Sequence, residues 1–95
     1  MERTVFPVDV LCLCNADGRI QPLRVRMEDE EKQLRCLDIA QVLGTREVNF
    51  VGIEARIYLC RAETRGSSWL FELQSKIRSR SWTLLRWGPC KRIGI

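Results

Sequence analysis

The sequence predicts an all-β protein, a small six-stranded antiparallel barrel-like roll. Apolar and polar residues alternate with a period of two over most of the 95 residues, which places successive side chains on opposite faces of a strand. Turn-forming residues recur about every ten residues, the spacing typical of small barrels and rolls. Apolar residues make up 45% and charged residues 29% of the chain, the balance of a globular domain.

A hairpin is expected near the start of the chain. Residues 8–14 are apolar on both strand faces, which indicates a central strand. Residues 15–18 (Asn-Ala-Asp-Gly) predict a tight turn, because Asn and Asp make local side-chain hydrogen bonds and Gly accepts a positive φ. Residues 19–27 form the second strand. Its expected inward residues are Leu23, Val25 and Met27, and its expected outward residues are Arg24 and Arg26.

The next segment supports two interpretations. The acidic run 28–31 is expected to be a solvated loop rather than a cation site, and a third strand starts near Lys32. Within residues 34–43, Leu34, Leu37 and Gln41 fit a helix, whereas Leu37, Ile39 and Leu43 fit a strand broken by a bulge. The strand is favoured, because the neighbours are strands and ten residues make only a marginal helix. Residues 44–49 are expected to be a loop.

Three further strands complete the predicted roll. Strand four, from Val51 to Cys60, has the clearest alternation, and a turn at 64–68 leads to strand five at 69–74. A basic turn at 76–81 precedes strand six at 82–87, which Gly88 and Pro89 should end, because proline donates no ladder hydrogen bond. The chain therefore divides into one β domain, 1–87, and a tail, 88–95. The core expected from period-two placement is Val10, Leu23, Val25, Ile53, Ile57, Leu59, Phe71 and Leu84.

The composition argues against an enzyme. The chain has no histidine, and so lacks the commonest general base and the commonest metal ligand. Its glycines are isolated, and they form neither a phosphate-binding loop nor a dinucleotide fingerprint. We expect no catalytic residues, no cofactor, no metal and no small-molecule substrate.

Five cysteines, Cys12, Cys14, Cys36, Cys60 and Cys90, do not form a disulfide framework. Without an export signal they are expected to be reduced thiols in the cytoplasm. Cys12 and Cys14 share a strand face and could begin a zinc site with Cys36 or Cys60, although buried apolar packing is the better interpretation. No apolar run is long enough to span a bilayer, so no membrane partner is expected.

Positive charge is concentrated in the second half of the chain. Residues 1–55 carry 7 Lys/Arg against 10 Asp/Glu, whereas residues 56–95 carry 9 against 2. Cations interleaved with aromatic residues are typical of single-strand nucleic-acid binding. The favoured interpretation is that the tryptophans belong to a core or an interface and that the charges solvate one face, although a surface position stays open. The residues that could bind an anionic partner are Arg56, Arg61, Lys76, Arg78, Arg80, Trp82, Arg86 and Trp87.

Two strands are apolar on both faces at once. In the first strand, Leu11 and Leu13 lie on the face opposite that of Val10 and Cys12. In strand five, Trp69 and Leu70 lie on opposite faces. A small barrel has one interior, so part of this surface needs another cover. We therefore expect a homo-oligomer and a non-enzymatic interaction module. The alternative is a nucleic-acid-binding barrel that uses the basic half.

The chain also resembles a family of short, β-rich bacterial proteins with no assigned activity. The resemblance lies in residues 17–26 (DGRIQPLRVR), 37–39 (LDI) and 52–60, in an aromatic strand around Leu70 and Phe71, and in a final tryptophan-bearing strand. It implies a compact β fold and no functional residues. The chain departs from the pattern in its basic insert at 76–81 and in its cysteine-bearing tail.

Overall fold

The computed structural model of the chain describes residues 2–28 and 31–90. This part of the chain is all-β and contains no helix, hence none that could cross a membrane. Its seven strands are β1 (Glu2–Cys14), β2 (Ile20–Glu28), β3 (Leu34–Asp38), β4 (Gln41–Phe50), β5 (Ile53–Thr64), β6 (Ser67–Lys76) and β7 (Trp82–Pro89).

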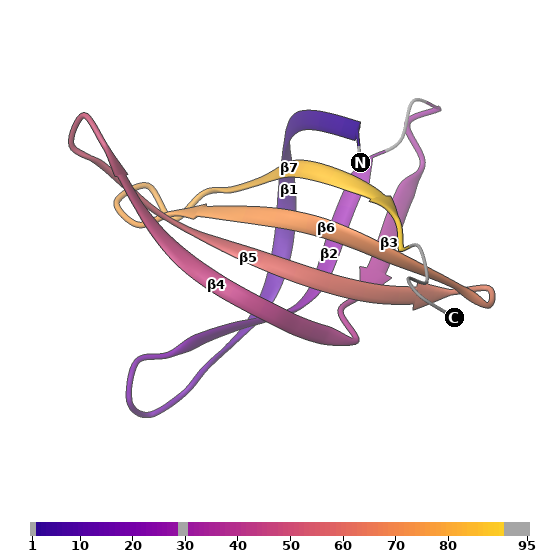
Figure 1. Ribbon diagram of the computed structural model, residues 1–95, viewed down its shortest axis with the longest axis horizontal. Helices are drawn as coiled ribbons and strands as arrows, with labels where there is room; N and C mark the ends of the chain where they lie inside the picture. The colour runs from indigo at the N-terminus through magenta and orange to yellow at the C-terminus, as the bar shows by residue number, and fades with distance from the viewer. Residues whose placement is uncertain (1, 29–30, 91–95) are drawn as a thin grey trace.

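The strands form one antiparallel sheet in the order β3-β2-β1-β7-β6-β5-β4. The sheet curls so that β4–β7 cross in front of β1–β3 (Figure 1), and it stays open between its edge strands β3 and β4. The predicted all-β antiparallel class is confirmed. The predicted count of six strands is wrong, because the single strand expected up to Leu43 is two strands, and residues 44–49 belong to the second of them, β4, and not to a loop. The predicted barrel-like roll is an open half-barrel.

The chain passes between the two halves of the sheet at two corners. The first is in β1, where Val8 pairs with Trp82 of β7 and the next residue, Asp9, pairs with Arg26 of β2. The second follows β3, where the Ile39 N–H donates to the Leu23 carbonyl and the Ala40 N–H donates to the Arg61 carbonyl. Strands that change partners in this way make the corners of orthogonally packed sheets. The segment 34–43 is therefore two strands and a corner, and the helical alternative is wrong.

The three predicted turns are confirmed at 15–18, 64–68 and 76–81. At the first, the Gly18 N–H donates to the Asn15 carbonyl and the Arg19 N–H donates to the Asp17 side chain. A fourth turn joins β4 to β5 through Val51 and Gly52, which have φ values of 53° and 80°. Positive φ at both central residues is the pattern of a type I′ hairpin turn.

The pairing of the described strands has four register shifts, one of them in β1 between Arg3 and Phe6, and the other three are bulges that change which face a strand buries. In β2, Leu11 pairs with Arg24 while Cys12 pairs with Pro22, so Leu23 is the extra residue. In the same way, Leu43 is extra in β4 and Leu85 is extra in β7. One extra residue shifts the inward-outward alternation by one position. Pro22 therefore takes a buried position in β2, where its missing N–H is tolerated at the bulge.

The core lies between the two halves of the sheet. Its buried cluster is Val8, Val25, Tyr58, Cys60, Ala62, Phe71, Leu73 and Leu84. Four predicted core residues are buried: Val25, Ile57, Phe71 and Leu84.

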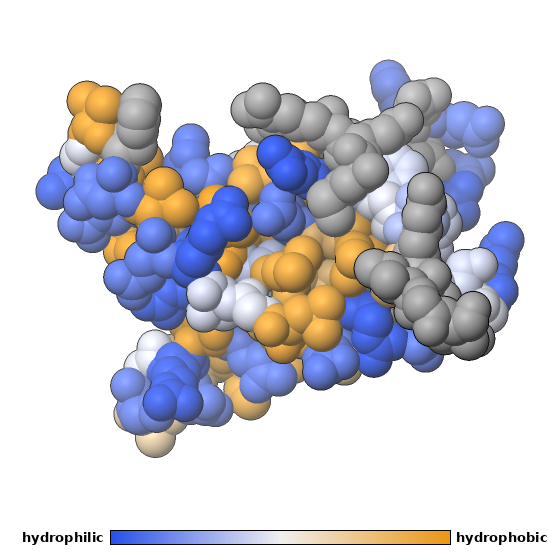
Figure 2. Space-filling model, viewed as in Figure 1, coloured by the Kyte–Doolittle hydropathy of each residue, from blue (hydrophilic) through white to orange (hydrophobic). Residues whose placement is uncertain are grey.

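Four other predicted core residues are not buried. The prediction that Leu23 and Ile53 belong to the core is wrong, because they are 38% and 55% exposed. Val10 and Leu59 are only partly buried. The bulge at Leu23 turns that side chain away from the core. In β5, the core covers the face of Tyr58 and Cys60, whereas the three predicted residues lie on the opposite face, where only Ile57 is buried, outside the core cluster. Figure 2 shows hydrophobic atoms gathered at the middle of this outer face, over β5 and β6.

The first and last strands are longer than predicted. Strand β1 begins at Glu2, and β7 continues through Gly88 to Pro89. The Cys90 N–H donates to the Ser68 carbonyl, so backbone pairing with β6 continues past the predicted end of the last strand at residue 87. Residues 91–95 of the predicted tail, and residues 29–30 of the acidic run, lie outside the described residues.

We expect Leu73→Ala to lower the free energy of unfolding by about 2–5 kcal/mol, because a fully buried leucine leaves a cavity when truncated. Leu73 is 0% exposed and Leu34 is 67% exposed. The control Leu34→Ala should change stability by about 0.5 kcal/mol or less. Urea denaturation of both variants measures this, and equal losses would contradict the assigned core.

We expect Val51→Asn to stabilise the protein by about 1 kcal/mol, because a β-branched residue is strained at positive φ and asparagine is not. Val51 is 86% exposed, so its side chain contributes little burial that could be lost. A rise in the midpoint of thermal unfolding is the expected observation. A lower midpoint would show that Val51 makes a stabilising contact within the folded chain.

Candidate interaction surfaces

The basic and aromatic residues predicted to bind an anion do not form one surface. Lys76, Arg78 and Arg80 lie at the turn between β6 and β7, and Trp82 starts the following strand. Trp87 lies near the opposite end of β7, where Glu2 of β1 is its backbone partner. The fold thus divides the predicted site between the two ends of the sheet.

Three of the predicted arginines are paired with carboxylates across or along the strands. Arg56 Nη2 donates to Glu47 Oε1 at 2.6 Å, and Arg61 pairs with Glu63. The hydrogen bonds that Arg56 makes to Glu47 and to Tyr58 raise its pKa. Both guanidinium groups therefore already have a carboxylate partner within the chain.

The third pair is shared between two arginines. Glu72 lies 3.6 Å from Arg46 and 3.6 Å from Arg86, and its side chain is only 13% exposed. Because the carboxylate of β6 is held between guanidinium groups from β4 and β7, it links three strands on the outer face of the sheet. Arg86 therefore also has a carboxylate partner within the chain.

The tryptophans pack on other aromatic rings. Trp82 lies 5.5 Å from Tyr58 between ring centroids and packs against the core. Trp87, which is 36% exposed, lies 5.5 Å from Trp69. Both distances are typical of interacting aromatic pairs. Of the alternatives left open by the sequence, Trp82 belongs to the edge of the core and Trp87 to an aromatic pair near the surface.

Lys76, Arg78 and Arg80 remain as exposed cations. Within residues 2–28 and 31–90, none of the three forms an ion pair with a carboxylate. The turn that carries them is closed by hydrogen bonds from the Lys76 N–H to the Ser81 carbonyl and from the Arg80 N–H to the Lys76 carbonyl. The basic surface is therefore this one turn.

The cysteines are free thiols with different environments. Cys60 is buried, which raises its pKa to about 12, whereas Cys14 and Cys36 are exposed. Burial and the neighbouring Cys14 raise the pKa of Cys12. The interpretation of the cysteines as buried apolar residues thus holds for Cys60 and is wrong for Cys14 and Cys36. No group of three or more metal-ligating side chains lies together in the described part of the chain.

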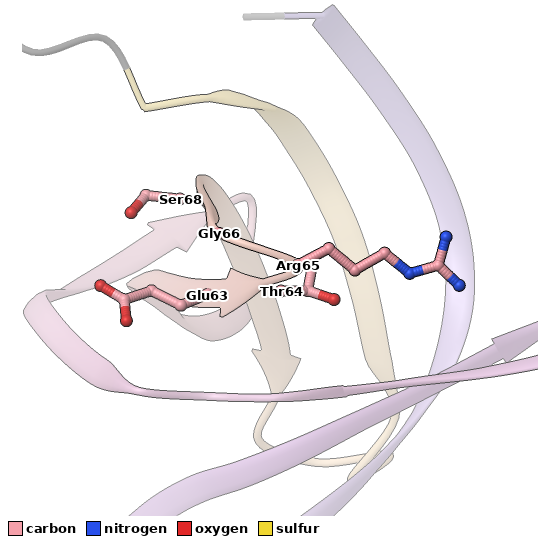
Figure 3. Close-up of a pocket in the computed structure, with 5 residues that line it drawn as sticks. All are labelled: Glu63, Thr64, Arg65, Gly66 and Ser68. Atoms are coloured by element: carbon pink, nitrogen blue, oxygen red, sulfur yellow. The ribbon is translucent and has the colours of Figure 1, made fainter.

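A shallow hollow of about 240 Å³ lies at the turn between β5 and β6. Figure 3 shows that the Arg65 side chain points away from those of Glu63 and Ser68. Small-molecule sites usually combine an apolar lining with polar groups that converge on one position. The hollow does not have this arrangement.

An apolar surface lies on the outer face of β1 and β2. Leu11, Leu13 and the bulged Leu23 are 58%, 47% and 38% exposed. Two ion pairs, between Arg26 and Asp9 and between Arg24 and Asp38, border these residues. We call this surface, formed by Asp9, Leu11, Leu13, Leu23, Arg24, Arg26 and Asp38, the leucine face. The sequence predicted the exposure of Leu11 and Leu13, whereas that of Leu23 depends on the bulge.

No family model, curated protein or solved structure matches the chain. The resemblance to short bacterial β proteins therefore stays a prediction.

We expect a mixed-sequence single-stranded oligonucleotide, at about 10 µM and low salt, to leave the intrinsic tryptophan fluorescence unchanged. Stacking on bases needs an open ring face, and Trp82 and Trp87 already pack on Tyr58 and Trp69. A fluorescence titration makes the measurement. Salt-sensitive quenching of the tryptophan fluorescence would show that a tryptophan ring is open to bases, which would contradict the packing of Trp82 on Tyr58 and of Trp87 on Trp69.

Proposed function

We propose that the chain is a non-enzymatic interaction module that self-associates through the leucine face. The observation that carries the proposal is the exposure of Leu11, Leu13 and Leu23 together on paired strands. Contiguous apolar surface of this kind is typical of protein–protein contacts. The absence of histidine from the sequence supports the non-enzymatic class, and the reduced cysteines support the cytoplasm as its location.

The leucines cannot be accommodated by the core of their own chain. Val8 and Val25 already occupy the inward positions of β1 and β2, where they contact the buried cluster. Because strand side chains alternate, Leu11 and Leu13 must point the other way. A second molecule is the simplest cover for them.

The borders of the leucine face favour a second copy of the same chain. Two arginines and two aspartates alternate there, and Leu11 pairs with Arg24, which in turn pairs with Asp38. The charges of the border sum to zero, so two copies related by a two-fold axis can exchange ion pairs without a net repulsion. A self-complementary patch is what an isologous dimer requires.

Nucleic-acid binding is the alternative function. It is supported by the three exposed cations of the β6–β7 turn. It is disfavoured by the internal pairing of Arg56, Arg61 and Arg86, and by the packing of both tryptophans on other rings.

We expect Leu11→Lys to weaken dimerisation by about a hundredfold or more, because a two-fold interface loses the buried leucine twice and gains two opposed cations. Sedimentation equilibrium of the wild type and the variant measures the change. Leu11 is exposed in the folded chain, so thermal unfolding at low protein concentration should be nearly unchanged.

The matched control is Ile53→Lys. Ile53 is 55% exposed, close to the 58% of Leu11, but it lies at the start of β5. This variant should dimerise as the wild type does. A wild type that is only monomeric at high micromolar concentration, or equal effects of the two variants, would refute the proposal.

A further inference from the structure

Two loops lie side by side at one end of the sheet, and neither contains a residue of the leucine face. The hairpin turn between β4 and β5 and the basic turn between β6 and β7 both occupy the left end in Figure 1. The Ile77 N–H donates to the Glu54 carbonyl at 3.0 Å, and Ala55 pairs with Lys76. The two loops are therefore held together by backbone hydrogen bonds. We call them the loop end.

The loop end exposes aliphatic side chains at its extremity. Val51, Ile53 and Ile77 are 86%, 55% and 47% exposed. Val51 occupies a two-residue turn, which leaves no extra chain that could fold back over it. Figure 2 shows hydrophobic atoms at the upper left, where the β4–β5 hairpin ends.

The same end carries three exposed cations. Lys76, Arg78 and Arg80 have no carboxylate partner in the part of the chain that the structure describes. Glu54 is exposed beside them and contributes one opposing charge. The loop end therefore combines protruding aliphatic groups with a net positive charge.

We propose that the loop end docks onto an anionic lipid surface. Aliphatic residues on protruding turns insert into the boundary between headgroups and acyl chains, and lysine and arginine beside them attract anionic headgroups. A protein partner would need a hollow complementary to two protruding turns, whereas a fluid lipid boundary takes up protruding aliphatic groups without a matching shape. A single nucleic-acid strand would need an open aromatic ring, and the nearby Trp82 packs on Tyr58. The proposal does not depend on self-association, because it uses different residues.

Co-sedimentation with vesicles tests the proposal. The wild-type chain should bind vesicles of phosphatidylcholine mixed with phosphatidylglycerol and should not bind phosphatidylcholine alone. Added salt should weaken the binding, because it screens exposed charges. The double variant Arg78→Ser/Arg80→Ser should lower the partition coefficient by about thirtyfold, which corresponds to about fivefold for each cation.

Val51→Asn separates binding from folding. It should lower vesicle binding by about fivefold, because an inserted aliphatic group is replaced by a polar one. The same substitution should raise the thermal midpoint, so weaker binding cannot be attributed to unfolding. The matched control is Arg65→Asn, which also places asparagine at a left-handed position of a two-residue turn but at the β5–β6 end. This control should bind vesicles as the wild type does.

Three results would overturn the proposal. The first is no binding to the anionic vesicles at low salt. The second is binding that the Arg78→Ser/Arg80→Ser and Val51→Asn variants leave unchanged. The third is binding to a single-stranded oligonucleotide that the double arginine variant weakens and Val51→Asn does not affect, which would assign the cations to nucleic acid instead.

Discussion

The architecture depends on the two corners where the chain crosses from one half of the sheet to the other. At the first, β1 exchanges the partner β7 for β2 between Val8 and Asp9. At the second, Ile39 and Ala40 donate hydrogen bonds to opposite halves of the sheet. Both corners hold the β1–β3 half of the sheet across the β4–β7 half. The inward faces of the two halves therefore pack on each other and enclose a single core. The same geometry leaves β3 and β4 as edges that diverge from their shared corner, which is why the sheet is a half-barrel and does not close.

Local signals predicted much of this fold. The Asn-Ala-Asp-Gly turn, the turn at 64–68 and the alternation of β6 around Phe71 depend only on neighbouring residues, and the structure confirms them. The errors in the predicted buried residues arise where a bulge shifts the inward-outward alternation by one position. Leu23 and Leu43 are extra residues in bulges, and a bulge depends on pairing with a distant strand, which a single sequence does not reveal. The turn at Val51 was missed for a different reason, because valine is a strand-forming residue that rarely adopts positive φ.

The candidate site shows the same limit. The sequence predicted one basic and aromatic surface from residues close together along the chain. The fold places the ends of β7 apart, and the strand register brings Glu47 to Arg56 and Glu72 between two arginines. Cross-strand carboxylates of this kind are invisible until the register is known. What remained after this pairing was a short turn whose cations stand beside aliphatic residues from another hairpin. A search for long apolar runs could not identify that combination, because its members come from separate loops.

Val51 links the local conformation to the proposed lipid surface. It is a β-branched residue at a φ of 53°, and it is 86% exposed. Both properties cost stability or solubility, and asparagine would avoid both at this position of a type I′ turn. A residue that breaks a local preference without a gain in packing is most often found where binding or catalysis requires it. The Val51 side chain is buried only if an apolar surface outside the chain contacts the tip of the β4–β5 hairpin. An anionic lipid surface, which is apolar inside and negatively charged at its boundary, would therefore explain both the strained, exposed valine and the neighbouring cations.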